Sequence, residues 1–191
     1  MKRVVIDRRE RVYDGFFKLD EAHLRYERFD GTMSEPVSRL ALERGDSVAV
    51  LLYRPGDEQI VLVNQFKYPT YEKGPGWIVE TLAGMIDRDE DPADAARREV
   101  LEESGYALRD LVHLSTFYVS PGGSTERVFL YLAEVADSDK VAEGGGHAIE
   151  GEDVASVELS LTDALAQVRS GAIVDAKTIV AIYALRDRMQ A

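Results

Sequence analysis

Three glutamates, Glu99, Glu102 and Glu103, lie close together in the stretch DAARREVLEESGY at residues 94–106. At about 100° per residue, their side chains would share roughly one third of the circumference of a helix. Carboxylates crowded on one arc repel each other unless a cation lies among them. Mg²⁺ takes oxygen ligands and usually shares them with substrate phosphates. The residue types therefore indicate a site for a hard divalent cation, with a solvated acidic helix face as the alternative.

The helix that must present these carboxylates has recognisable ends. Asp91 suits the N-cap position and Pro92 suits the first helical position. Gly105 suits the C-cap, where a left-handed backbone conformation is common. Ala96 and Val100 lie beside the glutamates on the helical wheel, so we expect them to face the core. The sequence therefore predicts a short helix between Asp91 and Gly105.

The residues on either side of this helix follow a defined spacing. The stretch GMIDRDEDPADAARREVLEESGY at residues 84–106 resembles the Nudix box with every fixed position filled: Gly84, Glu90, Arg98, Glu99, Glu102, Glu103, Gly105 and Tyr106. Tyr106 stands where the family more often has an aliphatic residue. The resemblance implies an α/β/α sandwich that hydrolyses a nucleoside diphosphate linked to another moiety, with Mg²⁺ or Mn²⁺ as cofactor.

The resemblance also implies roles for single residues. The metal ligands would be Glu99, Glu102, Glu103 and the main-chain carbonyl of Ala83, with Glu90 supporting the metal or the attacking water. Glu99 and Glu103 would thereby take part in catalysis. Arg98 would orient a glutamate at the catalytic centre, or alternatively form an ordinary i,i+4 ion pair with Glu102.

Outside the box, the chain is similar to the ADP-ribose pyrophosphatase group. The similarity lies in YDGFFKLD, LERGDSVAVLL, VNQFKYP and SPGGSTE, and in the later acidic stretch HAIEGEDV. In that group a glutamate of the acidic stretch orients or deprotonates the attacking water; Glu150 matches it best, and Glu152 is the alternative. The expected substrate-binding residues are Phe16, Phe17, Arg44, Lys67 and Pro121. Lys67 replaces the arginine that is usual at its position, and lysine lacks the planar fork of arginine.

These resemblances predict hydrolysis of the diphosphate bond of a nucleoside diphosphate sugar, with ADP-ribose as substrate and AMP and ribose 5-phosphate as products. The alternative within the class is GDP-mannose or another nucleotide sugar, because DAKTIVAIYAL and EGGG resemble GDP-mannose-cleaving relatives equally well. The alternative from another class is a non-catalytic Nudix-fold module that senses a nucleotide.

Composition excludes several functional classes and several kinds of site. The net charge of −12 argues against a nucleic-acid partner and against an anionic membrane surface, because both require a basic surface. The chain has no cysteine, which excludes disulfides and thiolate metal sites. No apolar run approaches the length of a membrane span, and the first residues lack the apolar stretch of a signal peptide. We therefore expect a cytoplasmic protein.

The order of the predicted elements is strands, helix, strands, helix, helix, which indicates an α/β or α+β fold with one mixed sheet covered by helices. We expect a β-rich segment over residues 1–44 and a Nudix hydrolase domain over residues 45–191. The segment is too small to bury a core unaided. The resembling group exchanges this segment across a homodimer, so the resemblance implies a homodimer here.

Overall fold

The computed structural model describes residues 2–146 and 153–190 of the 191-residue chain. The described residues form two compact units. Unit 1 consists of the first 46 residues together with Tyr118–Arg127, and unit 2 consists of Ser47–Phe117 and the residues from Val128 onward. The predicted division into 1–44 and 45–191 stays a prediction, because compactness alone does not show that a segment folds independently.

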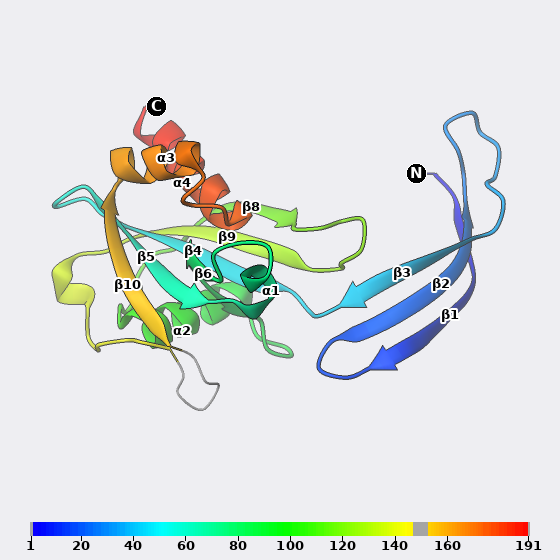
Figure 1. Cartoon of the computed structure of the whole chain (residues 1–191), viewed down its shortest axis with the longest axis horizontal. Helices are drawn as coiled ribbons and strands as arrows, with labels where there is room; N and C mark the ends of the chain where they lie inside the picture. The colour runs from blue at the N-terminus through cyan, green and yellow to red at the C-terminus, as the bar shows by residue number, and fades with distance from the viewer. Residues whose placement is uncertain (1, 147–152, 191) are drawn as a thin grey trace. The chain divides into compact units, whose positions relative to one another are not determined.

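Unit 1 is built on a three-stranded antiparallel sheet, drawn in blue in Figure 1. Its strands are β1 (Val4–Asp14), β2 (Lys18–Tyr26) and β3 (Val37–Glu43), with β2 in the centre. The loop of residues 118–127 joins the end of β3, where the Leu42 amide donates to the carbonyl of Gly123 at 2.7 Å. Unit 1 leaves large apolar side chains exposed, among them Val4, Ile6, Phe16 and Leu40.

Unit 2 is built on a mixed sheet whose main strands follow the order β10-β5-β4-β9-β8. These strands are β4 (Ser47–Arg54), β5 (Gln59–Phe66), β8 (Val112–Tyr118), β9 (Arg127–Glu134) and β10 (Val154–Ser160). Strand β4 pairs in parallel with β9 and antiparallel with β5. The residues of β4 from Ser47 to Tyr53 are buried, as the continuous apolar run predicts for a strand covered on both faces.

Two short strands, β6 (Trp77–Glu80) and β7 (Leu82–Met85), lie where β4 and β5 separate. Strand β4 pairs with β7 through its first half and with β5 through its last residues. Strand β5 pairs with β6 through its second half. The segment that leads into the predicted acidic helix therefore runs through the middle of the sheet.

Helices cover both faces of this sheet, as Figure 1 shows. On one face, Val48, Val50 and Leu52 of β4 pack with α2 (Pro92–Ser104). On the other face, the alternate residues Ala49 and Leu51 pack with α3 (Leu161–Ser170) and α4 (Ala176–Met189). This period-two alternation is what a strand between two helical layers requires. The predicted α/β/α sandwich with a mixed sheet is confirmed.

The ends of α2 follow the sequence prediction. The side chain of Asp91 accepts a hydrogen bond from the Ala93 amide at 2.8 Å, and Gly105 ends the helix with φ of 76°. Ala96 and Val100 are fully buried. Two short elements were not anticipated, the helix α1 (Tyr68–Tyr71) and the 3₁₀ turn η1 (Asp137–Asp139). Across the described residues, no helix is both long enough and apolar enough to cross a bilayer.

Candidate active site

Helix α2 lies over β7 so that its last turns come close to the first residues of that strand. Glu103 accepts a hydrogen bond from the amide of Ala83 at 3.0 Å. Five residues earlier in the helix, Arg98 donates to the main-chain carbonyl of Met85 at 3.1 Å. These two contacts hold the glutamate-bearing arc of the helix against the strand that precedes it in the chain.

Glu103 is the most deeply buried carboxylate of the box, with 6% of its surface exposed. Burial raises the pKa of its carboxyl from the ordinary value of 4.5 to about 8; the neighbouring carboxylates of Glu99 and Glu80 add to the rise, while the Ala83 amide and Lys67 oppose it. Burial disfavours an ionised carboxylate unless positive charge lies beside it. A cation at Glu103 would therefore offset the cost of ionising this buried carboxyl, which the surrounding protein groups do not offset.

Arg98 connects the other carboxylates. Its guanidinium donates twice to Glu90, at 2.9 and 3.0 Å, and once to Glu99 at 2.7 Å. It also lies 3.6 Å from a carboxylate oxygen of Glu102. The hydrogen bonds from Arg98 lower the pKa of Glu90, so Glu90 stays ionised. Arg98 thus makes both contacts that the sequence left as alternatives, orienting glutamates and pairing with Glu102.

Gly84 lacks a side chain at the point where Glu99 approaches β7. A Cβ atom built on Gly84 would lie 1.9 Å from the carboxyl carbon of Glu99. A side chain at this position would displace the carboxylate of Glu99 from the space that it occupies. The glycine is therefore needed for this placement of Glu99 and not for its backbone angle.

The donor set on α2 suits a hard cation. Glu99, Glu102 and Glu103 offer carboxylate oxygens, and oxygen-rich sets favour Mg²⁺ or Mn²⁺ over softer metals. Within the described residues, however, their oxygens do not form a group with all members within 4.8 Å of one another. Arg98 donates to Glu99 and the Ala83 amide donates to Glu103, so a shared cation would require a small rearrangement of these side chains.

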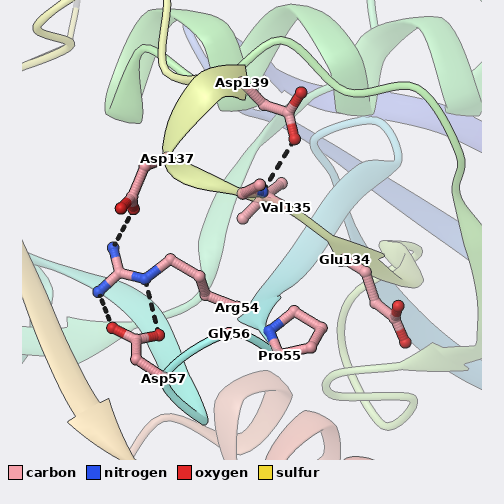
Figure 2. A pocket seen from close by; sticks show the side chains of 9 residues that line it. Arg54, Pro55, Gly56, Asp57, Glu134, Val135, Asp137 and Asp139 are labelled. Atoms are coloured by element: carbon pink, nitrogen blue, oxygen red, sulfur yellow. Dashed lines mark hydrogen bonds and ion pairs between the residues drawn. The ribbon is translucent and has the colours of Figure 1, made fainter.

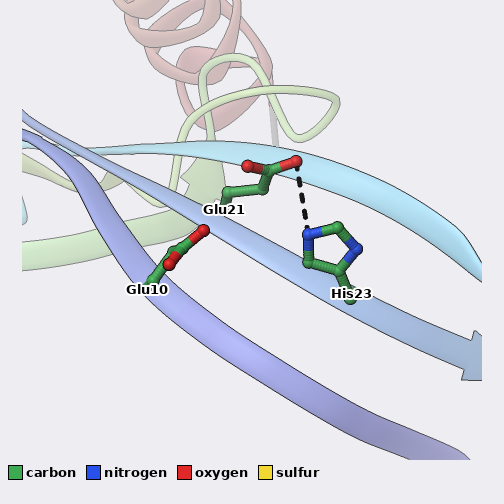
Figure 3. A group of neighbouring side chains, drawn as sticks. All are labelled: Glu10, Glu21 and His23. Carbon is green, nitrogen blue, oxygen red and sulfur yellow. Dashed lines mark ion pairs between the residues drawn. The ribbon is translucent and has the colours of Figure 1, made fainter.

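The one set of metal-capable side chains within 4.8 Å, across residues 2–146 and 153–190, is Glu10, Glu21 and His23 on the sheet of unit 1 (Figure 3). Each carboxylate already has partners. Glu10 pairs with Arg8, and Glu21 accepts from the hydroxyl of Ser38 and lies 3.5 Å from His23. These contacts account for the cluster without an ion.

A charged network beside Glu103 was missed in the sequence. Glu80, at the end of β6, is buried and pairs with Lys67 at 3.2 Å and with Lys177 of α4. Lys177 also lies 3.0 Å from Asp175, which caps α4. The sequence does contain an indication of this network. Lys177 lies in the first turn of a helix, where the helix dipole disfavours a positive charge unless a carboxylate lies nearby.

The predicted substrate-binding residues fall in both units. Lys67 follows β5 in unit 2, and its charge lowers the pKa of Glu103. In unit 1, the rings of Phe16 and Phe17 are 4.9 Å apart, and the guanidinium of Arg44 lies 5.7 Å from the ring of Phe17. Pro121 belongs to the 118–127 loop of the same unit. The two candidates for the base, Glu150 and Glu152, lie outside the described residues.

A pocket of about 610 Å³ lies at the turn between β4 and β5 in unit 2 (Figure 2). No glutamate of the box lines it; the lining residues are Arg54, Pro55, Gly56, Asp57, Glu134, Val135, Ala136, Asp137 and Asp139. Arg54 is already engaged by Asp57 and Glu158 at 2.6 and 2.7 Å. The pocket therefore offers a diphosphate more repulsion than attraction, and it is distinct from the candidate active site.

Comparison with known proteins shows which family the chain resembles. The NUDIX domain family matches residues 43–180. A GDP-mannose pyrophosphatase of Citrobacter koseri is 40% identical over 144 residues, which cover 74% of each chain. A GDP-mannose pyrophosphatase of Escherichia coli is 35% identical over 175 residues, covering 91% of this chain and 90% of the relative.

Among solved structures, an ADP compounds hydrolase superimposes with a TM-score of 0.74, covering 98% of this chain and 95% of that one. At 20% identity this likeness shows the fold alone. The domain match covers most of the chain and contains the whole acidic helix with its flanking glycines. The chain therefore belongs to the Nudix family and is a Nudix hydrolase.

Proposed function

We propose that this Nudix hydrolase is a divalent-metal-dependent pyrophosphatase of nucleoside diphosphate sugars. The observation that carries the proposal is the geometry of α2, which presents Glu99, Glu102 and Glu103 together and buries Glu103 against β7. The burial that raises the pKa of Glu103 to about 8 supports it. Such a set gains most from a bound divalent cation, which would neutralise a diphosphate and orient a water molecule. The names of the relatives support the same reaction class.

Individual residues would have the following roles in the hydrolysis. Glu99, Glu102, Glu103 and the carbonyl of Ala83 would hold the metal, with Mg²⁺ as the expected ion and Mn²⁺ as a substitute. Arg98 would orient Glu90 and Glu99 through its hydrogen bonds and would keep Glu90 ionised. Lys67, whose side chain is 40% exposed, would place positive charge beside the diphosphate.

We assign the role of general base to Glu150, with Glu152 as the alternative. The described residues on either side of this stretch support the assignment. Gly145 donates to the carbonyl of Glu103 at 2.9 Å and accepts from the amide of Val154 at 3.3 Å. The described residues that flank this stretch therefore lie beside the end of α2.

ADP-ribose is the substrate that we propose first, on the basis of the Phe16, Phe17, Arg44 and Pro121 positions in the sequence. In unit 1, Phe16, Phe17 and Arg44 lie close to one another, which suits a site for a base and its ribose. GDP-mannose is the second candidate, because the relatives at 35–40% identity are named GDP-mannose pyrophosphatases.

The test is a panel of nucleotide sugars turned over in ¹⁸O-labelled water with Mg²⁺ or Mn²⁺. We expect ADP-ribose to yield AMP and ribose 5-phosphate, with the label in one of the two phosphates. The matched variant Glu103→Gln should lose at least about 100-fold in kcat, because a metal ligand is removed. Rapid cleavage of GDP-mannose with negligible ADP-ribose turnover would replace the first substrate with the second.

The same variant tests the alternative from another class. A non-catalytic nucleotide-sensing module would bind a member of the panel without cleaving it, and Glu103→Gln would leave that binding unchanged. Cleavage of any nucleotide sugar that depends on both the metal and Glu103 excludes such a module.

We also propose that the chain forms a homodimer through unit 1, with exchange of its N-terminal segment. The support is the apolar surface of the three-stranded sheet, where Val4, Ile6 and Leu40 are each more than half exposed. A sheet of three strands gains stability when another surface covers it. A cytoplasmic location stays a prediction from the composition.

A further inference from the structure

The C-terminal end of α2 is enclosed by a short segment that comes much later in the chain, residues 141–146, called here the glycine segment. The amides of Val141 and Ala142 both donate to the carbonyl of Gly105, at 2.8 and 3.2 Å. The amides of Gly145 and Gly146 donate to the carbonyls of Glu103 and Glu102, at 2.9 and 3.2 Å. The last carbonyls of a helix have no partner within it, so these bonds complete the helix end.

The contact is too close for a side chain. A Cβ atom on Gly144 would lie 2.6 Å from the carbonyl oxygen of Glu103 and 2.7 Å from the Cα of Ser104. Both are backbone atoms, which cannot move aside as the end of a flexible side chain can. Gly144, Gly145 and Gly146 also have positive φ angles of 76°, 114° and 82°, which residues with a Cβ rarely adopt.

The two carbonyls that accept these bonds belong to the residues whose side chains are the candidate metal ligands. A main-chain shift at Glu103 or Glu102 would displace the carboxylates directly, because each side chain extends from the same Cα. Groups that orient the ligands of a metal without touching it typically change metal affinity by about 10- to 100-fold when they are altered.

We propose that Gly144 and Gly145 are positioning residues for the divalent cation, and that the glycine segment sets the placement of the Glu102 and Glu103 carboxylates from behind the helix. The inference rests on the proposed metal-dependent function and deepens it. It assigns a role in metal binding to two residues that offer no side-chain ligand and that lie about 40 positions after the glutamates they support.

The experiment compares Gly144→Ala with Gly171→Ala in the full chain. Gly171 ends α3, has a φ of 78°, and has no atom within 4 Å of the position of an added Cβ. Both substitutions therefore place a Cβ on a residue of similar positive φ, but only the one at Gly144 collides with α2. Binding of Mn²⁺ alone is followed by the electron paramagnetic resonance signal of the free ion, and unfolding temperature is measured beside it.

We expect Gly144→Ala to weaken Mn²⁺ binding by about 10- to 100-fold, whereas Gly171→Ala binds as the wild type does. We also expect kcat to fall more than KM rises, because the substrate contacts are untouched. Equal Mn²⁺ affinity in the wild type and Gly144→Ala would overturn the proposal, and so would an equal loss in both alanine variants.

Gly145→Ala keeps the test decisive if Gly144→Ala does not fold. A Cβ on Gly145 meets no atom within 4 Å, so only its φ of 114° is strained. We expect a smaller loss of Mn²⁺ affinity in the same direction, and wild-type affinity in this variant would overturn the proposal.

Glu103→Gln distinguishes a failure of the proposed metal site from a failure of the proposed positioning role. If it too binds Mn²⁺ as the wild type does, the metal site itself fails; if it loses Mn²⁺ while both glycine variants retain it, only the positioning role fails.

Discussion

Glu103 shows how a single buried carboxylate can make stability depend on pH. Its pKa is raised by burial, with further contributions from Glu99 and Glu80, to about 8 in the folded chain, against an ordinary value of 4.5. Between these two values the folded state holds a proton that the unfolded state has released. The free energy of unfolding must therefore fall as the pH rises through this range, and the contribution is fully present only below the lower value.

We predict that the metal-free protein is less stable at about pH 8 than at about pH 5, by an amount of a few kcal/mol at most. Glu103→Gln should remove most of this slope, because glutamine has no proton to lose. Saturating Mg²⁺ should also flatten it by favouring the ionised carboxylate. Urea unfolding midpoints at the two pH values measure the effect, and an unchanged slope in Glu103→Gln would contradict it.

At the scale of secondary-structure elements, a buried ion pair connects β6 with α4. Glu80 has 7% of its side chain exposed and Lys177 has 16%, and burial opposes the charge of Lys177 while Glu80 and Asp175 raise its pKa. Close by, the buried hydroxyl of Thr178 accepts a hydrogen bond from the Thr81 amide at 2.8 Å. The start of α4 is thus hydrogen-bonded to the strand segment that leads into α2.

We predict that Glu80→Gln lowers the free energy of unfolding by about 3 kcal/mol, because it leaves Lys177 buried with only Asp175 as partner. The matched control is Arg109→Gln, which breaks an ion pair whose arginine is 82% exposed. That change should cost no more than about 1 kcal/mol. Chemical denaturation measures the free energy of unfolding of both variants. Equal decreases would show that burial does not determine how much the Glu80 ion pair contributes to stability.

For the whole molecule, the net charge opposes self-association, whereas the exposed apolar surface favours it. The net charge of −12 makes copies of the chain repel one another. Unit 1 nevertheless leaves Ile6 60% exposed and Phe16 94% exposed. Such surface is costly in a monomer and supports the proposed association through unit 1.

We predict that the chain has twice its monomer mass of 21.3 kDa in solution and that Ile6→Glu shifts it toward the monomer. Val174→Glu is the matched control, because Val174 is 50% exposed but belongs to unit 2. Light scattering after size-exclusion chromatography measures both variants. A monomeric wild type, or dissociation by the control alone, would contradict the proposal of a dimer built on unit 1.

Local signals account for most of what could be predicted. The caps at Asp91 and Gly105 and the buried strand at β4 depend on neighbours in the chain, and the structure confirms them. The short helix α1 was missed because it has only four residues and too little sequence to show a period. The network of Glu80, Lys67 and Lys177 was missed because its members lie 13 to 97 positions from Glu80 in the chain.

The sequence by itself determined the acidic helix, its ends, the α/β/α class and the family, since helical period, capping chemistry and motif spacing are all local properties. The tertiary structure alone decided that Glu103 is buried against the Ala83 amide, that Gly84 makes room for Glu99, and that the glycine segment completes the end of α2. The reason is physical: the pKa and position of a carboxylate depend on which distant segments exclude water from it, and spacing along a chain does not specify those segments.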